Sequence, residues 1–148
     1  MVDIVNPVTV LATQDDIYAM QWVAQDTPSD ALFLINTRVW QGELHVGSDG
    51  GWWLPILGRR SVTLPWVLYY QSEPAYRDAV VDLAKTVEEA PSLDDPAFVA
   101  RLQQEGVDYV FVGAHGGRLM PKDLDASPHF ALRYASGPVR VYQFVPNP

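Results

Sequence analysis

Side chains that could bind a ligand are concentrated in two stretches of the sequence, residues 37–60 and residues 113–120. The first stretch holds five glycines, three tryptophans and three arginines, and the second holds a histidine and an arginine among three glycines. Tryptophan rings can stack on sugars, and guanidinium groups can bind hydroxyl or phosphate oxygens. The residues expected to contact a ligand are Arg38, Trp40, Asp49, Gly50, Gly51, Trp52, Trp53, Arg60, His115 and Arg118.

A glycine-rich turn, Gly47-Ser48-Asp49-Gly50-Gly51, could present backbone N–H groups to an oxyanion or a phosphate. It is not followed by the Lys-Ser or Lys-Thr pair of a P-loop, and it lacks the Gly-x-Ser-x-Gly form of a hydrolase nucleophile. A tight turn with a structural role is therefore the favoured interpretation of these glycines.

Trp52 and Trp53, next to Asp49 and Arg60, could hold a sugar ring between an aromatic face and charged hydrogen-bonding groups. The alternative is that at least one of the two indoles fills core. The two interpretations differ in whether an indole faces solvent beside the Arg60 guanidinium.

The remaining candidates for chemistry are isolated residues. His45 and His115 could act as a general base or as a metal pair, but neither has a second ligand at metal-binding spacing, and the chain has no cysteine. Glu43 and Asp49 are the only loop acids close enough in sequence for paired-carboxylate chemistry, and nothing fixes their separation. No metal and no cofactor is expected, and no catalytic residue is assigned.

The elements that must position these residues follow from periodicity and capping signals. A Thr-x-x-Asp capping box at residues 13–16 starts a helix that ends before Pro28, and further helices open at Pro74 and Pro96. Apolar runs at residues 31–36 and 107–112 predict two strands that are covered on both faces. A short strand is expected within residues 61–70, one helical turn at 121–124, and a hairpin at 130–134 and 139–145.

These elements predict one α/β domain over residues 1–148, with a mixed sheet, central parallel strands, a C-terminal antiparallel hairpin and helices packed on the sheet. Ligands of open α/β sheets bind beyond the carboxyl ends of the parallel strands. Residues 37–60 and 113–120 leave two such ends, so both loops are expected to meet at a single site.

Charge and hydropathy exclude several classes of function. The 148-residue chain has a formal net charge of −8 with only ten lysines and arginines, which argues against a nucleic-acid partner. No stretch of 18 uninterrupted apolar residues is present, and the first residues lack the pattern of a signal peptide. The chain is therefore expected to behave as a soluble unit of undetermined compartment, either whole or as part of a longer protein.

Several segments together resemble the soluble C-terminal region of polytopic bacterial membrane proteins of the GT-C glycosyltransferase type. The resemblance covers nearly the whole chain and rests on residues 16–22, Asp26-Thr-Pro28, residues 31–36, Trp40, Asp49-Gly-Gly-Trp-Trp-Leu-Pro55, Arg60, residues 107–113 and Val141-Tyr. A more distant similarity links the chain to oligosaccharyltransferase catalytic subunits. Their Trp-Trp-Asp-Tyr-Gly motif differs from the order Asp49-Gly-Gly-Trp-Trp found here.

The resemblance implies an extracytoplasmic domain on a bacterial membrane, without catalysis of its own because the catalytic acids of such enzymes lie in membrane loops. Its partners would be the parent membrane domain and a sugar or lipid-linked sugar. The alternative is a self-contained small-molecule-binding or enzymatic domain in which Asp49, Arg60 and His115 do acid–base work. A third reading is an interaction domain whose tryptophan loop packs on lipids or on the parent protein.

Overall fold

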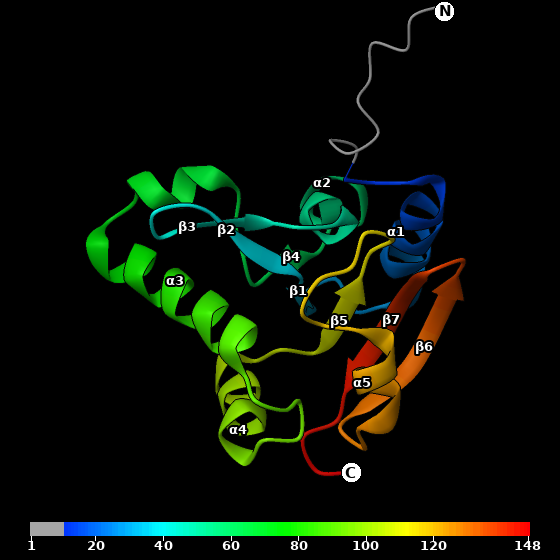
Figure 1. Ribbon diagram of the computed structural model, residues 1–148. Helices are drawn as coiled ribbons and strands as arrows, with labels where there is room; N and C mark the ends of the chain where they lie inside the picture. Colours follow the sequence, from blue (N-terminus) through cyan, green and yellow to red (C-terminus); the bar gives the residue numbers. More distant parts are fainter. Residues whose placement is uncertain (1–10) are drawn as a thin grey trace, which may run out of the picture.

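A computed structural model describes residues 11–148 as a mixed five-stranded sheet with helices on both faces (Figure 1). The strand order is β4-β1-β5-β7-β6, and a separate two-stranded ribbon is formed by β2 and β3. The strands are β1 (Leu32–Ile35), β2 (Thr37–Gln41), β3 (Leu44–Gly47), β4 (Ser61–Val62), β5 (Tyr109–Val112), β6 (Phe130–Ser136) and β7 (Val139–Phe144). The helices are α1 (Gln14–Asp26), α2 (Leu54–Leu57), α3 (Pro74–Glu89), α4 (Pro96–Glu105) and α5 (Pro121–Ala126), with short 3₁₀ turns η2 (Gly50–Trp53) and η3 (Val67–Gln71).

The two central strands are parallel and buried on both faces, as the apolar runs predict. β1 pairs with β5 in the register Phe33↔Tyr109 and Ile35↔Phe111, and it also pairs in parallel with the short β4. β7 runs antiparallel to β5, and β6 closes the sheet as an antiparallel hairpin with β7. The mixed sheet with central parallel strands and a C-terminal hairpin is therefore confirmed.

Alternate residues along the strands feed two hydrophobic clusters, because successive side chains of a strand point to opposite faces. Phe33 and Ile35 pack in the cluster that contains α1, while Leu34 packs in the cluster that contains α4. Val110 and Tyr142 belong to the second cluster, and both are fully buried. The sheet is thus a middle layer, and this accounts for the lack of polar positions in β1 and β5.

Helix boundaries follow the capping signals. Thr13 and Asp16 form a reciprocal capping box at the start of α1. The carboxylate of Asp95 accepts hydrogen bonds from two backbone N–H groups in the first turn of α4, which ends at Gly106 in the left-handed conformation. Elements predicted from caps are therefore found where the sequence indicated them.

Residues 37–60 were expected to form an irregular loop, but they contain the ribbon β2–β3, η2 and α2. The ribbon was missed because four consecutive residues of β2 are exposed, so that no alternation is visible, and because a register shift follows Val39. The reversal between the two strands uses Gly42 at a positive φ of 56°.

Candidate functional site

The two glycine-rich stretches meet where β1 and β5 end, as expected from parallel neighbouring strands. The Asp49 carboxylate accepts a hydrogen bond of 2.8 Å from the backbone N–H of Gly113. The Ser48 hydroxyl donates to the Gly116 carbonyl at 3.1 Å. The sequence therefore placed these loops correctly relative to one another.

Asp49 lies at the centre of this junction and is completely buried. Besides Gly113, its carboxylate accepts hydrogen bonds from Asn36 Nδ2 at 3.0 Å and from the Gly51 N–H at 2.9 Å. Asn36 in turn binds the backbone of Leu119, donating to its carbonyl and accepting from its N–H at 2.7 Å. The hydrogen-bonding groups of both side chains are thus engaged by the protein itself.

A second buried carboxylate, Asp16, completes the junction from α1. One oxygen caps the helix through Thr13, while the other accepts a hydrogen bond of 3.1 Å from the Ala114 N–H. The capping box identifies the first role from sequence. The second role joins residues 98 positions apart, and no sequence signal indicates it.

The glycines of the junction allow backbones and carboxylates to touch. A Cβ atom on Gly50 would lie 2.5 Å from Asp16 Cγ, and one on Gly113 would lie 2.7 Å from the Gly50 nitrogen. A Cβ on Gly117 would lie 2.7 Å from Asn36 Cγ. Since the Gly51 N–H is bound by Asp49, this turn supports the structural interpretation and does not form an open phosphate cradle.

Burial raises the pKa of Asp49 to about 6, against the lowering effect of its hydrogen bonds from Asn36, Gly51 and Gly113. The nearby Asp16 carboxylate adds to the increase. A carboxyl group that titrates near neutrality is often found in active sites, but it also arises wherever a carboxylate is sealed inside a fold.

Asp49→Asn tests this shift through the pH dependence of stability. Between about pH 4 and pH 6 the folded state retains a proton that the unfolded chain has released, so a rising pH destabilises the wild type. The stability advantage of wild type over Asp49→Asn should therefore shrink by up to about 3 kcal/mol from pH 4 to pH 7. Urea unfolding of both proteins across this range measures it. An advantage that grows with pH would show that the fold favours the ionised carboxylate.

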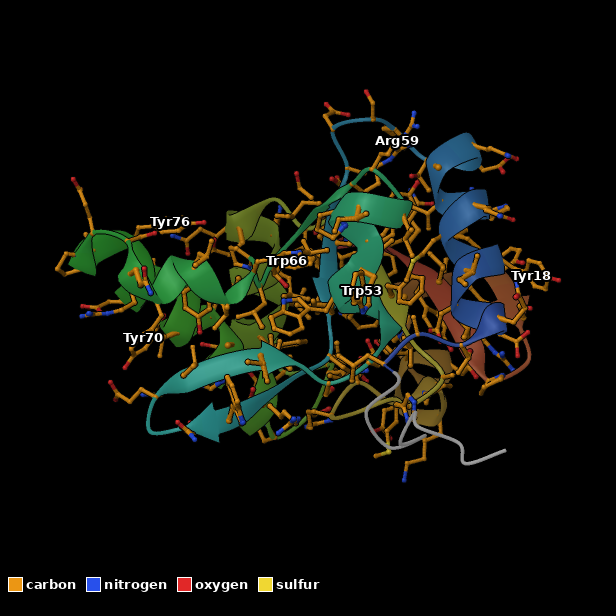
Figure 2. The ribbon with its side chains drawn as sticks, turned by 90° about the horizontal axis from the view of Figure 1, so that it is seen from above. Tyr18, Trp53, Arg59, Trp66, Tyr70 and Tyr76 are labelled. Atoms are coloured by element: carbon orange, nitrogen blue, oxygen red, sulfur yellow. The ribbon has the colours of Figure 1, made fainter. Side chains whose placement is uncertain are left out.

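The two tryptophans differ in exposure, and Figure 2 labels the more exposed one, Trp53. Trp52 is half-buried, and its Nε1 donates to the Pro65 carbonyl at 3.3 Å. Trp53 is 38% exposed and meets Trp66 edge to face, with ring centroids 5.6 Å apart. One indole thus faces solvent.

Arg60 does not lie beside these indoles as a free hydrogen-bond donor. Its guanidinium is buried at the end of α1, where it donates to the carbonyls of Val23, Ala24 and Thr27 at 2.7–3.2 Å. It also donates to the Thr27 hydroxyl and to the carbonyls of Gly58 and Arg59. The structure therefore places Arg60 in a capping position and separates it from the other candidate residues.

The remaining candidates are exposed or half-buried. Arg38 and Trp40 are exposed on β2, and His115 is exposed on the loop that follows β5. Arg118 is half-buried, donates to the Ala90 carbonyl at 2.6 Å and lies 3.8 Å from the Asp123 carboxylate.

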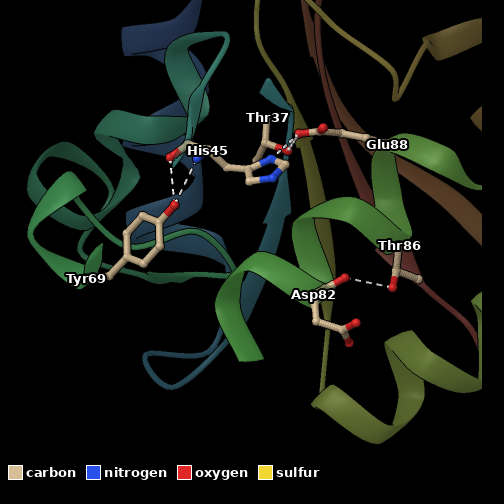
Figure 3. A network of polar contacts seen from close by, with 6 residues as sticks. All are labelled: Thr37, His45, Tyr69, Asp82, Thr86 and Glu88. Carbon is tan, nitrogen blue, oxygen red and sulfur yellow. Dashed lines mark hydrogen bonds and ion pairs between the residues drawn. The ribbon is translucent and has the colours of Figure 1, made fainter. Parts of the chain in front are cut away.

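A buried polar cluster that the sequence did not reveal attaches the ribbon to α3 (Figure 3). The His45 Nδ1 atom lies 2.9 Å from Glu88 Oε1, which also accepts a hydrogen bond of 2.6 Å from the Thr37 hydroxyl. The Tyr69 hydroxyl binds both the N–H and the carbonyl of His45 at 3.0 Å. His45 was considered as a general base or a metal ligand in the loop at residues 37–60, but it lies in β3 and is completely buried.

Comparison with known proteins assigns the chain neither a family nor a function. No protein-family model, curated protein or solved structure matches the chain. Within residues 11–148 there is no group of three or more histidines and acids that could hold a metal ion. No helix in this part of the chain is long and apolar enough to cross a bilayer.

Proposed function

We propose that this chain is a non-catalytic, extracytoplasmic domain of a membrane glycosyltransferase-like protein, which contributes recognition and not chemistry. The observation that carries the proposal is the complete burial of Asp49, whose carboxylate is occupied by three internal donors. A catalytic acid or base must reach a proton of its substrate within about 3 Å. The most suitable carboxylate at the strand ends is instead used to join two loops.

Recognition would use exposed side chains on the segments that follow β1 and β5. Trp53 offers an open aromatic face, and Arg38, Trp40 and His115 supply further polar and aromatic groups at the surface. Stacking on an exposed indole and hydrogen bonding to hydroxyl groups are the usual means of binding a sugar. The resemblance to GT-C proteins favours a sugar or an acceptor group as the ligand.

An enzymatic domain is the second candidate, and the raised pKa of Asp49 favours it. This reading requires the two loops to separate, because Asp49 and Asp16 both bind the segment that follows β5. Arg60, which was also proposed for acid–base work, would still be held at the end of α1.

Substitution of the tryptophans separates recognition from packing. Trp52→Ala should lower the free energy of unfolding by about 3 kcal/mol, since it removes a packed ring and the hydrogen bond to Pro65. Trp53→Ala should cost less than about 1 kcal/mol but abolish the response of tryptophan fluorescence to a bound sugar or sugar phosphate. Tyr76→Ala, which removes an exposed aromatic side chain from α3, is the control and should retain the response.

The proposal also predicts the gene structure. Repeated apolar segments in the same open reading frame, upstream of the Met1 codon, would support a domain of a membrane protein. A start codon with no coding sequence upstream would favour the self-contained alternative.

The fluorescence titration has its own contradicting outcome. A fluorescence response to sugar that survives Trp53→Ala would show that Trp53 is not part of the binding surface.

A further inference from the structure

An exposed apolar surface lies on η2, α2 and the residue before η3, and η2 contacts β5; Figure 2 labels its two tryptophans, Trp53 and Trp66. We call it the apolar ledge, and it consists of Trp53, Ile56, Leu57 and Trp66, which are 38%, 54%, 44% and 43% exposed. Trp53 and Trp66 are in edge-to-face contact, and α2 places Ile56 and Leu57 one turn beyond Trp53. The four-residue α2 buries only Leu54 completely, so its other apolar side chains remain available.

The sequence segment that carries the ledge differs in charge from the rest of the chain. Residues 50–72 contain no aspartate or glutamate, whereas the whole chain has 18 acids and a net charge of −8. Only two residues of this segment are charged: Arg60, which is buried, and Arg59, which is exposed. Arg59 takes part in none of the ion pairs found among residues 11–148. The four side chains of the ledge are therefore uncharged, and Arg59 is the exposed charged residue of the segment that carries them.

We infer that the apolar ledge docks on the headgroup region of a bilayer that contains anionic phospholipid. Tryptophan is favoured at this depth because its ring is apolar and its N–H can bind polar groups, and aliphatic side chains beside it can enter the acyl boundary. Arg59 would face the lipid phosphates.

The size of the ledge argues against a second copy of the chain as its occupant. Four side chains of roughly 200 Å² each, about half exposed, offer on the order of 400 Å². A stable protein interface needs about 800 Å² on each partner. A bilayer does not require a closed, complementary interface, so a small apolar surface suffices when the protein is already attached.

The position of the first described residues is compatible with such attachment to a membrane. The first described residues run beside α2, which carries Ile56 and Leu57 of the ledge (Figure 1). A membrane segment preceding them, as the proposed function requires, would bring the ledge to the bilayer. Trp53 would then lie at the depth where a bilayer presents the sugar of a lipid-linked donor. For this biological setting, the inference rests on the proposed function.

Vesicles test the inference directly. The chain, tethered through an N-terminal histidine tag to nickel-chelating lipid, is placed on phosphatidylcholine–phosphatidylglycerol vesicles with brominated acyl chains, and quenching of tryptophan fluorescence is measured. We expect quenching that is stronger than on phosphatidylcholine alone. Ile56→Ser/Leu57→Ser, which leaves every tryptophan in place, should reduce the docked fraction on the order of tenfold.

The control is Val39→Ser/Leu132→Ser, which removes two side chains of matched exposure, 48% and 50%, outside the ledge. Its tryptophan fluorescence should be quenched by the brominated lipid as strongly as that of the wild type. Equal loss in the two double variants, or no bromine quenching of the tethered wild type, would overturn the inference. A dimer in sedimentation that Ile56→Ser/Leu57→Ser dissociates would assign the ledge to a second copy instead. Docking by a chain whose gene encodes no membrane segment would retain the ledge and refute the parent assignment.

Discussion

Arg60→Lys is expected to lower the free energy of unfolding by about 3–5 kcal/mol, although it preserves the charge. The planar guanidinium of Arg60 serves six acceptors, and three of them are carbonyls at the end of α1. A lysine ammonium has three donors on one atom and cannot reach a spread of acceptors in this way. Several buried carbonyls would then lose a donor, and any that is left without another carries a desolvation cost.

Arg59→Lys is the matched control, because it makes the same chemical change one position earlier on an exposed side chain. It should change stability by less than about 0.5 kcal/mol. Urea unfolding of the two variants beside the wild type gives the comparison. Equal stability of Arg60→Lys and Arg59→Lys would show that Arg60 does not hold the end of α1.

Gly113→Ala should destabilise the protein by about 3 kcal/mol or more, because it affects the loop junction at its narrowest point. The added methyl would lie 2.7 Å from the Gly50 nitrogen and 2.8 Å from Asp49 Cβ, and neither is the end of a flexible side chain. Relief of this overlap requires the loops to separate, which would also break the hydrogen bond from Gly113 to Asp49.

Gly116→Ala, three residues later, provides the comparison for Gly113→Ala. No atom lies within 4 Å of its added methyl, but its φ of 65° gives alanine a cost of about 1–2 kcal/mol. In thermal unfolding, the melting temperature of Gly113→Ala should therefore be well below that of Gly116→Ala. The reverse order would contradict the contact between the two loops.

The sequence predicts the sheet better than it predicts the side-chain environments. β1 and β5 present apolar side chains to both faces of the sheet, a pattern that predicts central parallel strands and hence the meeting of the two loops. Burial of Asp49 could not be predicted in this way, since it depends on donors from Asn36 and Gly113 that only the fold brings together.

Long-range partners explain the other differences. Arg60 follows a left-handed Arg59 and a turn, and nothing in the intervening residues indicates that its acceptors belong to α1. His45 is paired with Glu88, which the sequence places in an acidic helix with no apparent relation to the ribbon. Motif spacing reports local geometry, whereas these contacts depend on the packing of α1 and α3 against the rest of the fold.

The central claim is that the strand-end junction serves architecture and recognition without chemistry. The most direct measurement is an assay of the purified 148-residue chain with a polyprenyl-phosphate-linked, radiolabelled sugar, in which both transfer and hydrolysis are followed. We predict no turnover above a protein-free control at any pH from 4 to 8. Turnover by the wild type that Asp49→Asn abolishes, in a variant that remains folded, would contradict the account and establish Asp49 as a catalytic group.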